Sequence, residues 1–170
     1  MKKALLFAIG LLTLSSAFSQ IIVSGSLDNN SKTVWTNNNI YILQGFVRVT
    51  ANDTLEIQPG TIIKGDFASK GSLIIERDGY LVADGTETSP IVFTSQKPVG
   101  QRAYGDWGGL IICGRASVNQ PANAANGTSQ GEAVVEGGVG SIYGGGTNPD
   151  DSDNSGIIRY VRIEFGGIPF

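Results

Sequence analysis

Short segments rich in β-branched and aliphatic residues alternate with turn residues from Ile40 to the end of the chain. The turns include Asn52-Asp53, Pro59-Gly60 and Asp78-Gly79. After Gln20, no stretch of a dozen residues keeps a helical period without an intervening Gly or Pro. This alternation predicts an all-β fold. The expected strands are residues 40–43, 46–50, 54–58, 61–64, 72–76, 80–83, 91–95, 109–113, 133–136 and 157–165.

Aliphatic and glycine positions recur at a spacing of 18 to 20 residues. Leu55 aligns with Leu73 and then Ile91 at an offset of 18, and Gly60 aligns with Gly79 at an offset of 19. A repeat of about this length, with short strands and a glycine at the corner, is typical of a β-solenoid coil. We therefore expect a parallel β-helix in which Leu55, Leu73 and Ile91 stack in one inward column, about 4.8 Å apart. An antiparallel sandwich is the alternative.

The composition limits the chemistry that is available to the chain. Its 170 residues include 24 Gly, one Cys and no His, and the formal net charge is −3. A chain without His has no His general base and no His metal ligand, and a single Cys allows no internal disulfide. The glycine content, about twice the average and without a period of three, excludes collagen. The acidic balance argues against nucleic acid as a partner, because phosphate binding needs a basic surface.

Residues 1–19 have the pattern of a secretory signal peptide. Lys2 and Lys3 precede an apolar run at residues 4–14, and small residues follow, with cleavage expected after Ser19 or after Ala17. No later run reaches the roughly 18 apolar residues of a membrane helix, so we expect no membrane span in the mature chain. The prediction is an exported protein, extracellular or on the outer cell surface, with residues 20–170 as one β-helix domain. A buried N-terminal helix is the alternative.

Two polar, glycine-rich segments interrupt the repeat in the second half of the chain. Residues 120–131 and 137–156 contain few apolar residues. We expect loop insertions after residue 115 that leave the coil, with mobility in one or both. The last expected strand, residues 157–165, alternates so that Val161 and Ile163 share one face.

Several segments together resemble a known family. They are Tyr41-Ile-Leu-Gln-Gly-Phe-Val47, Leu55-Glu-Ile-Gln-Pro-Gly-Thr-Ile-Ile-Lys-Gly-Asp66, Gly71-Ser-Leu-Ile-Ile-Glu-Arg-Asp-Gly79, Ser89-Pro-Ile-Val-Phe-Thr-Ser95, Gly105-Asp-Trp-Gly-Gly-Leu-Ile-Ile-Cys-Gly114 and Tyr160-Val-Arg-Ile-Glu-Phe-Gly-Gly167. They are similar to the N-terminal part of a family of exported, right-handed parallel β-helix proteins of Gram-negative bacteria. The similarity covers about residues 35–170.

This resemblance implies a fold and a cell-surface setting, but it carries no agreed biochemical activity. Many members end in a sorting domain for type IX secretion, and the present sequence stops at Phe170 without one. We therefore expect either a truncated chain or a short variant, with an open last coil whose strand edges lack partners.

The most polar segment runs from Asn148 to Gly156. Asp150, Asp151, Asp153 and Asn154 bring hard oxygen ligands close together, as Ca²⁺ sites require. The spacing is not that of an EF-hand, because no Glu stands at the twelfth position. A calcium loop is one interpretation, with Ca²⁺ as the only cofactor expected, and a solvated, turn-rich loop is the other.

Three further residues are candidates for carbohydrate contact. Glu56 and Glu76 alternate outward in the expected register and should lie near one another on successive coils, where paired carboxylates can act as acid and base. Trp107, within Gly-Asp-Trp-Gly-Gly, can stack on a sugar ring or instead cover the side of a coil. The alternative for both glutamates is a solvated ladder. No segment repeats a lyase or hydrolase signature, so no catalytic residue is assigned.

These features predict an exported structural or adhesion-type β-helix scaffold, with glycans or other surface proteins as partners. A carbohydrate-binding or polysaccharide-degrading β-helix protein is the alternative. An enzyme would show a concave groove with two or more acidic residues of shifted pKa, and a scaffold would show a flat, polar outer face.

Overall fold

The computed structural model describes residues 18–167, which form thirteen strands and no helix. Nearly all of the predicted signal peptide lies outside the described residues. No segment of residues 18–167 forms a helix that could cross a lipid bilayer. The strands are β1 (Ser19–Leu27), β2 (Lys32–Trp35), β3 (Asn39–Val49), β4 (Thr54–Ile57), β5 (Ile62–Gly65), β6 (Ser72–Ile75), β7 (Tyr80–Asp84), β8 (Ile91–Ser95), β9 (Gly109–Ile112), β10 (Ala133–Val134), β11 (Ile142–Tyr143), β12 (Gly156–Arg159) and β13 (Val161–Ile163).

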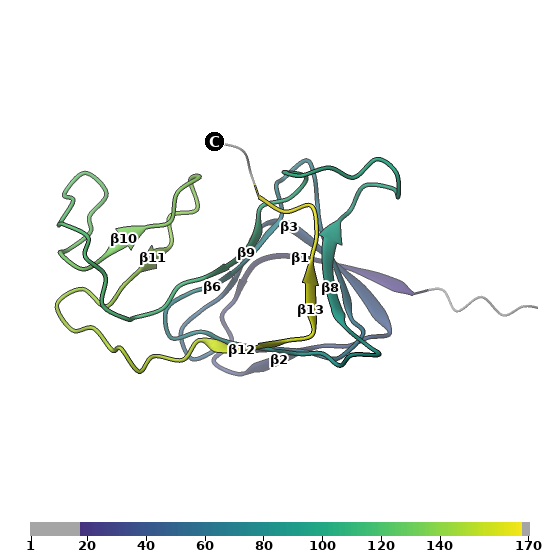
Figure 1. Cartoon of the computed structure of the whole chain (residues 1–170), viewed down its shortest axis with the longest axis horizontal. Coiled ribbons are helices and arrows are strands. Elements are labelled where there is room, and N and C mark those ends of the chain that lie inside the picture. The colour runs from purple at the N-terminus through teal and green to yellow at the C-terminus, as the bar shows by residue number, and fades with distance from the viewer. Residues whose placement is uncertain (1–17, 168–170) are drawn as a thin grey trace, which may run out of the picture.

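The chain winds into a parallel β-helix with three faces, seen end-on in Figure 1. The first face is made by β2, β4, β7 and β12. The second contains β5, β8 and β13 beside the first half of β3, and the third contains β6 and β9 beside the second half of β3. β3 continues around one corner, which joins the last two faces into one sheet. All of these pairings are parallel, so the predicted β-helix is confirmed and the antiparallel sandwich is excluded.

The expected register of the coils is wrong. Leu55 pairs with Leu81, 26 residues along, whereas Leu73 pairs with Val47 and Leu110 on another face. Successive coils differ in length, because Ile40 pairs with Ile62 but Ile62 pairs with Val92. The repeat of 18 residues therefore advances by two of the three faces and not by a full turn. Leu55, Leu73 and Ile91 all point inward, but each belongs to a different face.

Alternate residues of strands such as β4, β5 and β7 fill the centre of the coils. Their burial follows the period of two that is expected for strands with one face in the core. Two aromatic pairs extend this core: Trp35 stacks on Tyr41 with ring centroids 4.7 Å apart, and Phe93 stacks on Trp107 at 6.3 Å. The buried cluster comprises Trp35, Tyr41, Leu43, Val47, Val49, Leu55, Ile57, Ile63, Leu73, Ile75, Leu81, Ala83, Ile91, Phe93 and Trp107.

One corner has the same backbone conformation in three successive coils. Asn30, Asn52 and Asp78 each lie two residues before a strand of the first face, and each has a positive φ, between 47° and 67°. Asn and Asp tolerate this left-handed conformation better than other residues with a side chain, which explains the Asn and Asp in these turns. In the last coil Asp153 takes the matching position, because Ser155 lies where Tyr80 does in the coil before.

The predicted strands are largely confirmed, with three omissions. β1, β2 and β11 were not expected. The predicted strand at residues 157–165 is divided into β12 and β13 at Tyr160, whose φ is 50°. This break turns the chain from the first face to the second. Val161 and Ile163 do share one side of β13, where they pair with Ile91 and Phe93.

Candidate functional site

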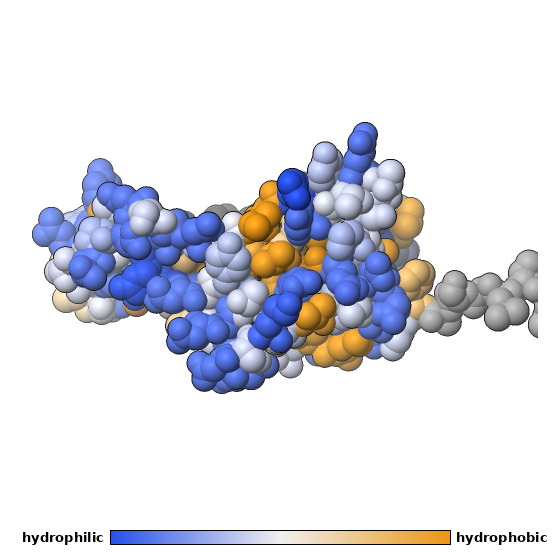
Figure 2. Space-filling model, turned by 90° about the horizontal axis from the view of Figure 1, so that it is seen from below, coloured by the Kyte–Doolittle hydropathy of each residue, from blue (hydrophilic) through white to orange (hydrophobic). Residues whose placement is uncertain are grey.

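The segment between β9 and β12, residues 113–155, leaves the coil as a separate lobe. It confirms the predicted insertions after residue 115. The preceding coil covers the same corner with the few residues between β6 and β7. Within the lobe, β10 and β11 form a short antiparallel hairpin. Figure 1 shows the lobe projecting from one side of the coils, and the face of the lobe that is seen in Figure 2 is mostly hydrophilic.

Arg48 and Glu76 lie on the outer side of the third face and bind the part of the lobe that contains Val139 and Ser141. The Arg48 guanidinium bonds to the Glu76 carboxylate and donates to Ser141 Oγ and to the carbonyl oxygen of Val139, both at 2.6 Å. Ser141 Oγ in turn donates to Glu76 Oε1 at 2.8 Å. Ile74, which points outward between Arg48 and Ile111, is fully buried. The lobe thus covers part of this face.

Two more arginines fix the far side of the lobe and its neck. Arg77 donates to Glu132 Oε1 at 2.7 Å and to the carbonyl oxygen of Gly144 at 2.8 Å. The hydrogen bond from Arg77 lowers the pKa of the Glu132 carboxyl below its ordinary value. Arg115 pairs with Asp78 at 2.9 Å. We call Arg48, Glu76, Arg77 and their lobe partners the clamp.

Glycines inside the lobe allow its backbone segments to pack directly against one another, because a side chain at these positions would clash with the neighbouring backbone. A Cβ on Gly144 would lie 2.3 Å from the carbonyl oxygen of Gly131, and one on Gly145 would lie 2.3 Å from that of Arg115. Backbone hydrogen bonds cross the same contacts, including Gly144 to Gly114 at 2.9 Å and Gly146 to Gly131 at 3.0 Å. The glycine-rich segments, expected as loops with mobility, are thus packed against one another.

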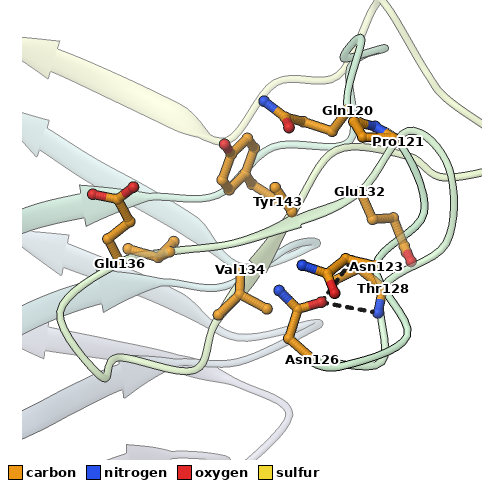
Figure 3. A pocket seen from close by; sticks show the side chains of 11 residues that line it. Gln120, Pro121, Asn123, Asn126, Thr128, Glu132, Val134, Glu136 and Tyr143 are labelled. Atoms are coloured by element: carbon orange, nitrogen blue, oxygen red, sulfur yellow. Dashed lines mark hydrogen bonds between the residues drawn. The ribbon is translucent and has the colours of Figure 1, made fainter.

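A polar cavity of about 460 Å³ opens in the outer part of the lobe (Figure 3). Its wall includes the turn around Asn123 and Asn126, the hairpin residues Val134 and Tyr143, and the glutamates Glu132 and Glu136. None of these residues was predicted as a functional site from the sequence. The sequence features that could have indicated the site are the Asn-Gly turn at residues 126–127 and the isolated Tyr143. Nothing in the sequence shows that these two features lie close together in the fold.

The four residues of the predicted calcium loop do not converge on a common point. Asp150 Oδ1 accepts from Ser152, Asp151 Oδ1 accepts from Ser117, and Asp153 Oδ2 accepts from the backbone N–H of Arg115. Asn154 Oδ1 accepts from the N–H of Gly156. Across residues 18–167, no group of three or more acidic or Cys side chains is placed to hold a metal ion. These hydrogen bonds hold the segment as a turn-rich loop, and the calcium site stays a prediction.

Glu56 and Glu76 lie on different faces, so their expected proximity on successive coils is wrong. Glu56, on β4, pairs with Lys32 at 2.9 Å. Glu76 follows β6 and belongs to the clamp. The reason is the register: 20 residues separate the two glutamates, and that is less than a full turn.

Trp107 is fully buried, so no ring face is open to a sugar, and the packing interpretation is the correct one. Its Nε1 donates to the carbonyl oxygen of Glu164 at 2.7 Å. The neighbouring Asp106 is buried as well and accepts from Lys97 Nζ at 2.8 Å, from Ser95 Oγ and from the N–H of Ala103. The hydrogen bond from Lys97 is the largest effect on this carboxyl, whose pKa is lowered to about 2.

The fold and the sequence together define a class of protein, the parallel β-helix domains. Residues 25–170 match the family described as pectate-lyase-like beta helix domain, and the chain belongs to that family. No curated protein and no solved structure matches the chain. Membership of this family establishes the β-helix architecture but not an activity.

Proposed function

We propose that this protein is an exported β-helix scaffold of the adhesion type, which presents the lobe as its contact surface. The observation that carries the proposal is the clamp. A polar insertion without a large core of its own would sample many conformations, and each surface contact would then cost the entropy of ordering it. The clamp orders the lobe before a partner binds and so lowers this entropic cost of binding.

The outer faces of the coils support a scaffold role. On these faces Glu56, Asp84 and Glu164 each pair with a neighbouring Lys or Arg. Among the carboxyl groups with a shifted pKa, every shift is downward, for example at Asp66, Asp84 and Glu164. A general acid needs a raised pKa, so these groups are suited to charge pairing. The signal-peptide pattern at residues 1–19 supports export.

The test compares two folded variants of the full chain. Arg77→Ala removes both anchors on the far side of the lobe, and Arg162→Ala removes an exposed pair with Glu164 on β13. Wild type and Arg162→Ala should retain polysaccharide-coated or matrix-protein-coated beads equally, and Arg77→Ala should retain several-fold fewer. Glu132→Gln, which keeps the shape of the partner, should have a smaller effect in the same direction.

Export is tested by cell fractionation. The full chain should leave the cytoplasm of a bacterial host, and a variant without residues 2–19 should stay there. Two outcomes would overturn the proposal: equal retention by wild type and a correctly folded Arg77→Ala, or the release of reducing sugar ends from a polysaccharide by the wild type. The second would establish polysaccharide degradation instead.

A further inference from the structure

The cavity of the lobe has the size of a small-ligand site. Its volume of about 460 Å³ falls within the range of roughly 300–1,000 Å³ that is common for such sites. It is open to solvent, and polar side chains supply much of its wall. Tyr143 lies on one side and the turn with Asn123 and Asn126 on another (Figure 3).

The turn holds two amide side chains in fixed orientations. The backbone of Asn123 and Thr128 is joined by two hydrogen bonds, at 3.0 and 3.1 Å, which close the turn. The side-chain oxygen of Asn123 accepts from the N–H of Ala125, and that of Asn126 accepts from Oγ1 of Thr128 at 2.8 Å. Because each oxygen is bonded within the turn, the NH₂ group of each amide is left as the available donor. Neither NH₂ group has a protein acceptor within residues 18–167.

Acceptors and an apolar surface complete the wall. Glu136 is exposed, and no ion pair or hydrogen bond of its carboxylate occurs within the described part of the chain. Tyr143 is half-buried and presents a ring and a hydroxyl group. Amide donors, a carboxylate acceptor and an aromatic ring together suit a ligand that has hydroxyl groups on its edges and C–H groups on its faces.

The charge of the cavity decides between neutral and acidic ligands. Its lining includes Glu132 and Glu136 and no Lys or Arg. Arg77 compensates the charge of Glu132, but that of Glu136 remains. A carboxylate ligand would meet this negative charge without a cation in the lining, so a uronic acid unit is disfavoured.

We infer that this cavity binds a neutral sugar unit of a polysaccharide, with the ring of the sugar against Tyr143 and its hydroxyl groups on the amides of Asn123 and Asn126 and on Glu136. The inference rests on the proposed adhesion function and names its ligand class. It also separates this protein's ligand from pectate, the polyuronate in the family's description.

The experiment measures binding of the full chain to neutral oligosaccharides of glucose, mannose, galactose and xylose, and to oligogalacturonate, by calorimetry. At least one neutral oligosaccharide should bind, and oligogalacturonate should bind at least tenfold more weakly. Tyr143→Ala should weaken neutral binding about tenfold. Tyr104→Ala is the matched control, because Tyr104 is highly exposed and lies outside the lobe.

Two isosteric variants test the polar contacts. Asn126→Asp keeps the oxygen that accepts from Thr128 but replaces the NH₂ donor, and it should weaken neutral binding about tenfold without lowering the melting temperature. Glu136→Gln removes the unpaired charge and should narrow the gap between oligogalacturonate and the neutral ligand.

The inference is overturned if no neutral oligosaccharide binds, if oligogalacturonate binds more tightly than all of them, or if folded Tyr143→Ala and Asn126→Asp both bind like wild type. Retention on coated beads separates this failure from failure of the scaffold proposal. If Arg77→Ala loses bead retention but Tyr143→Ala and Asn126→Asp retain beads like wild type, the sugar-binding inference for the cavity is rejected. The proposal that the clamped lobe is the contact surface is then kept. If all three variants retain beads like wild type, both the sugar-binding inference and the scaffold proposal are rejected.

Discussion

Gly65 should be one of the least replaceable residues of the coil. It ends β5 on the inward side, and the indole of Trp107 occupies the space that a side chain at this position would take. A Cβ on Gly65 would lie 2.3 Å from Cβ and 2.5 Å from Cγ of Trp107. Its φ is not in the left-handed region, so the effect of Gly65→Ala is a steric one.

The magnitude follows from two contributions. Overpacking of a filled core costs about 1–3 kcal/mol. If Trp107 moves to make room, its Nε1 loses the 2.7 Å hydrogen bond to the carbonyl oxygen of Glu164, and a buried donor without a partner costs about 1–3 kcal/mol. We expect Gly65→Ala to lower the free energy of unfolding by about 2–6 kcal/mol. For a chain of this length the melting temperature should fall by about 10 °C.

The assay is urea and thermal unfolding followed by tryptophan fluorescence and near-ultraviolet circular dichroism. Gly166→Ala is the matched control, because its Cβ would meet the same indole at an ordinary 3.4 Å, again without a left-handed φ. It should change the free energy of unfolding by less than about 0.5 kcal/mol. A Gly65→Ala protein that melts with the wild type, or a Gly166→Ala protein that is equally destabilised, would refute the packing argument.

Three other predictions use the titration and ligand properties of single groups. Asp106 has a pKa lowered to about 2, so its contribution to stability is present above pH 4 and is lost as the pH falls toward 2; urea titrations should show this loss, and Asp106→Asn should be less stable at pH 7 with a flatter profile between pH 4 and 2. Burial raises the pKa of the Cys113 thiol to about 11, so iodoacetamide at pH 8 should modify the native protein far more slowly than the urea-unfolded one, and equal rates would contradict the buried position. EGTA should leave the melting temperature unchanged within about 1 °C, because Asp150 accepts from Ser152 in its own loop, whereas Asp151 and Asp153 accept from Ser117 and Arg115 at the neck of the lobe; a rise of several degrees with added calcium would support the predicted calcium site.

The class of fold could be predicted from the sequence because it depends on local patterns. Alternation in segments such as residues 54–58 fixes strands, and Gly, Asn and Asp fix corners. The register could not be predicted, because every face presents similar aliphatic residues to the core. Leu55 resembles Leu73 as closely as it resembles its true neighbour Leu81, and coils of unequal length hide the real period.

The candidate site was beyond prediction for a different reason. Its anchors join residues that are far apart in the chain: 93 positions separate Arg48 from Ser141, and 55 separate Arg77 from Glu132. Such pairs have no signature in a single sequence, because an exposed arginine has the same local pattern with or without a partner. The polar composition of the lobe was visible, but its packing depends on close contacts such as that between Gly131 and Gly144.

The neck of the lobe explains how the coil can carry a long insertion. Arg115 donates its backbone N–H to Asp153 at 3.0 Å, and Asp153 stands at the corner position that Asn52 and Asp78 take in earlier coils. The chain therefore re-enters the coil in register with the corners of the earlier coils, and a longer connection adds little closure entropy. It follows that Tyr143→Ala, in the outer lobe, should leave the melting temperature within about 2 °C of wild type while changing binding. A large loss of stability in that variant would show that the lobe and the coil unfold as one unit.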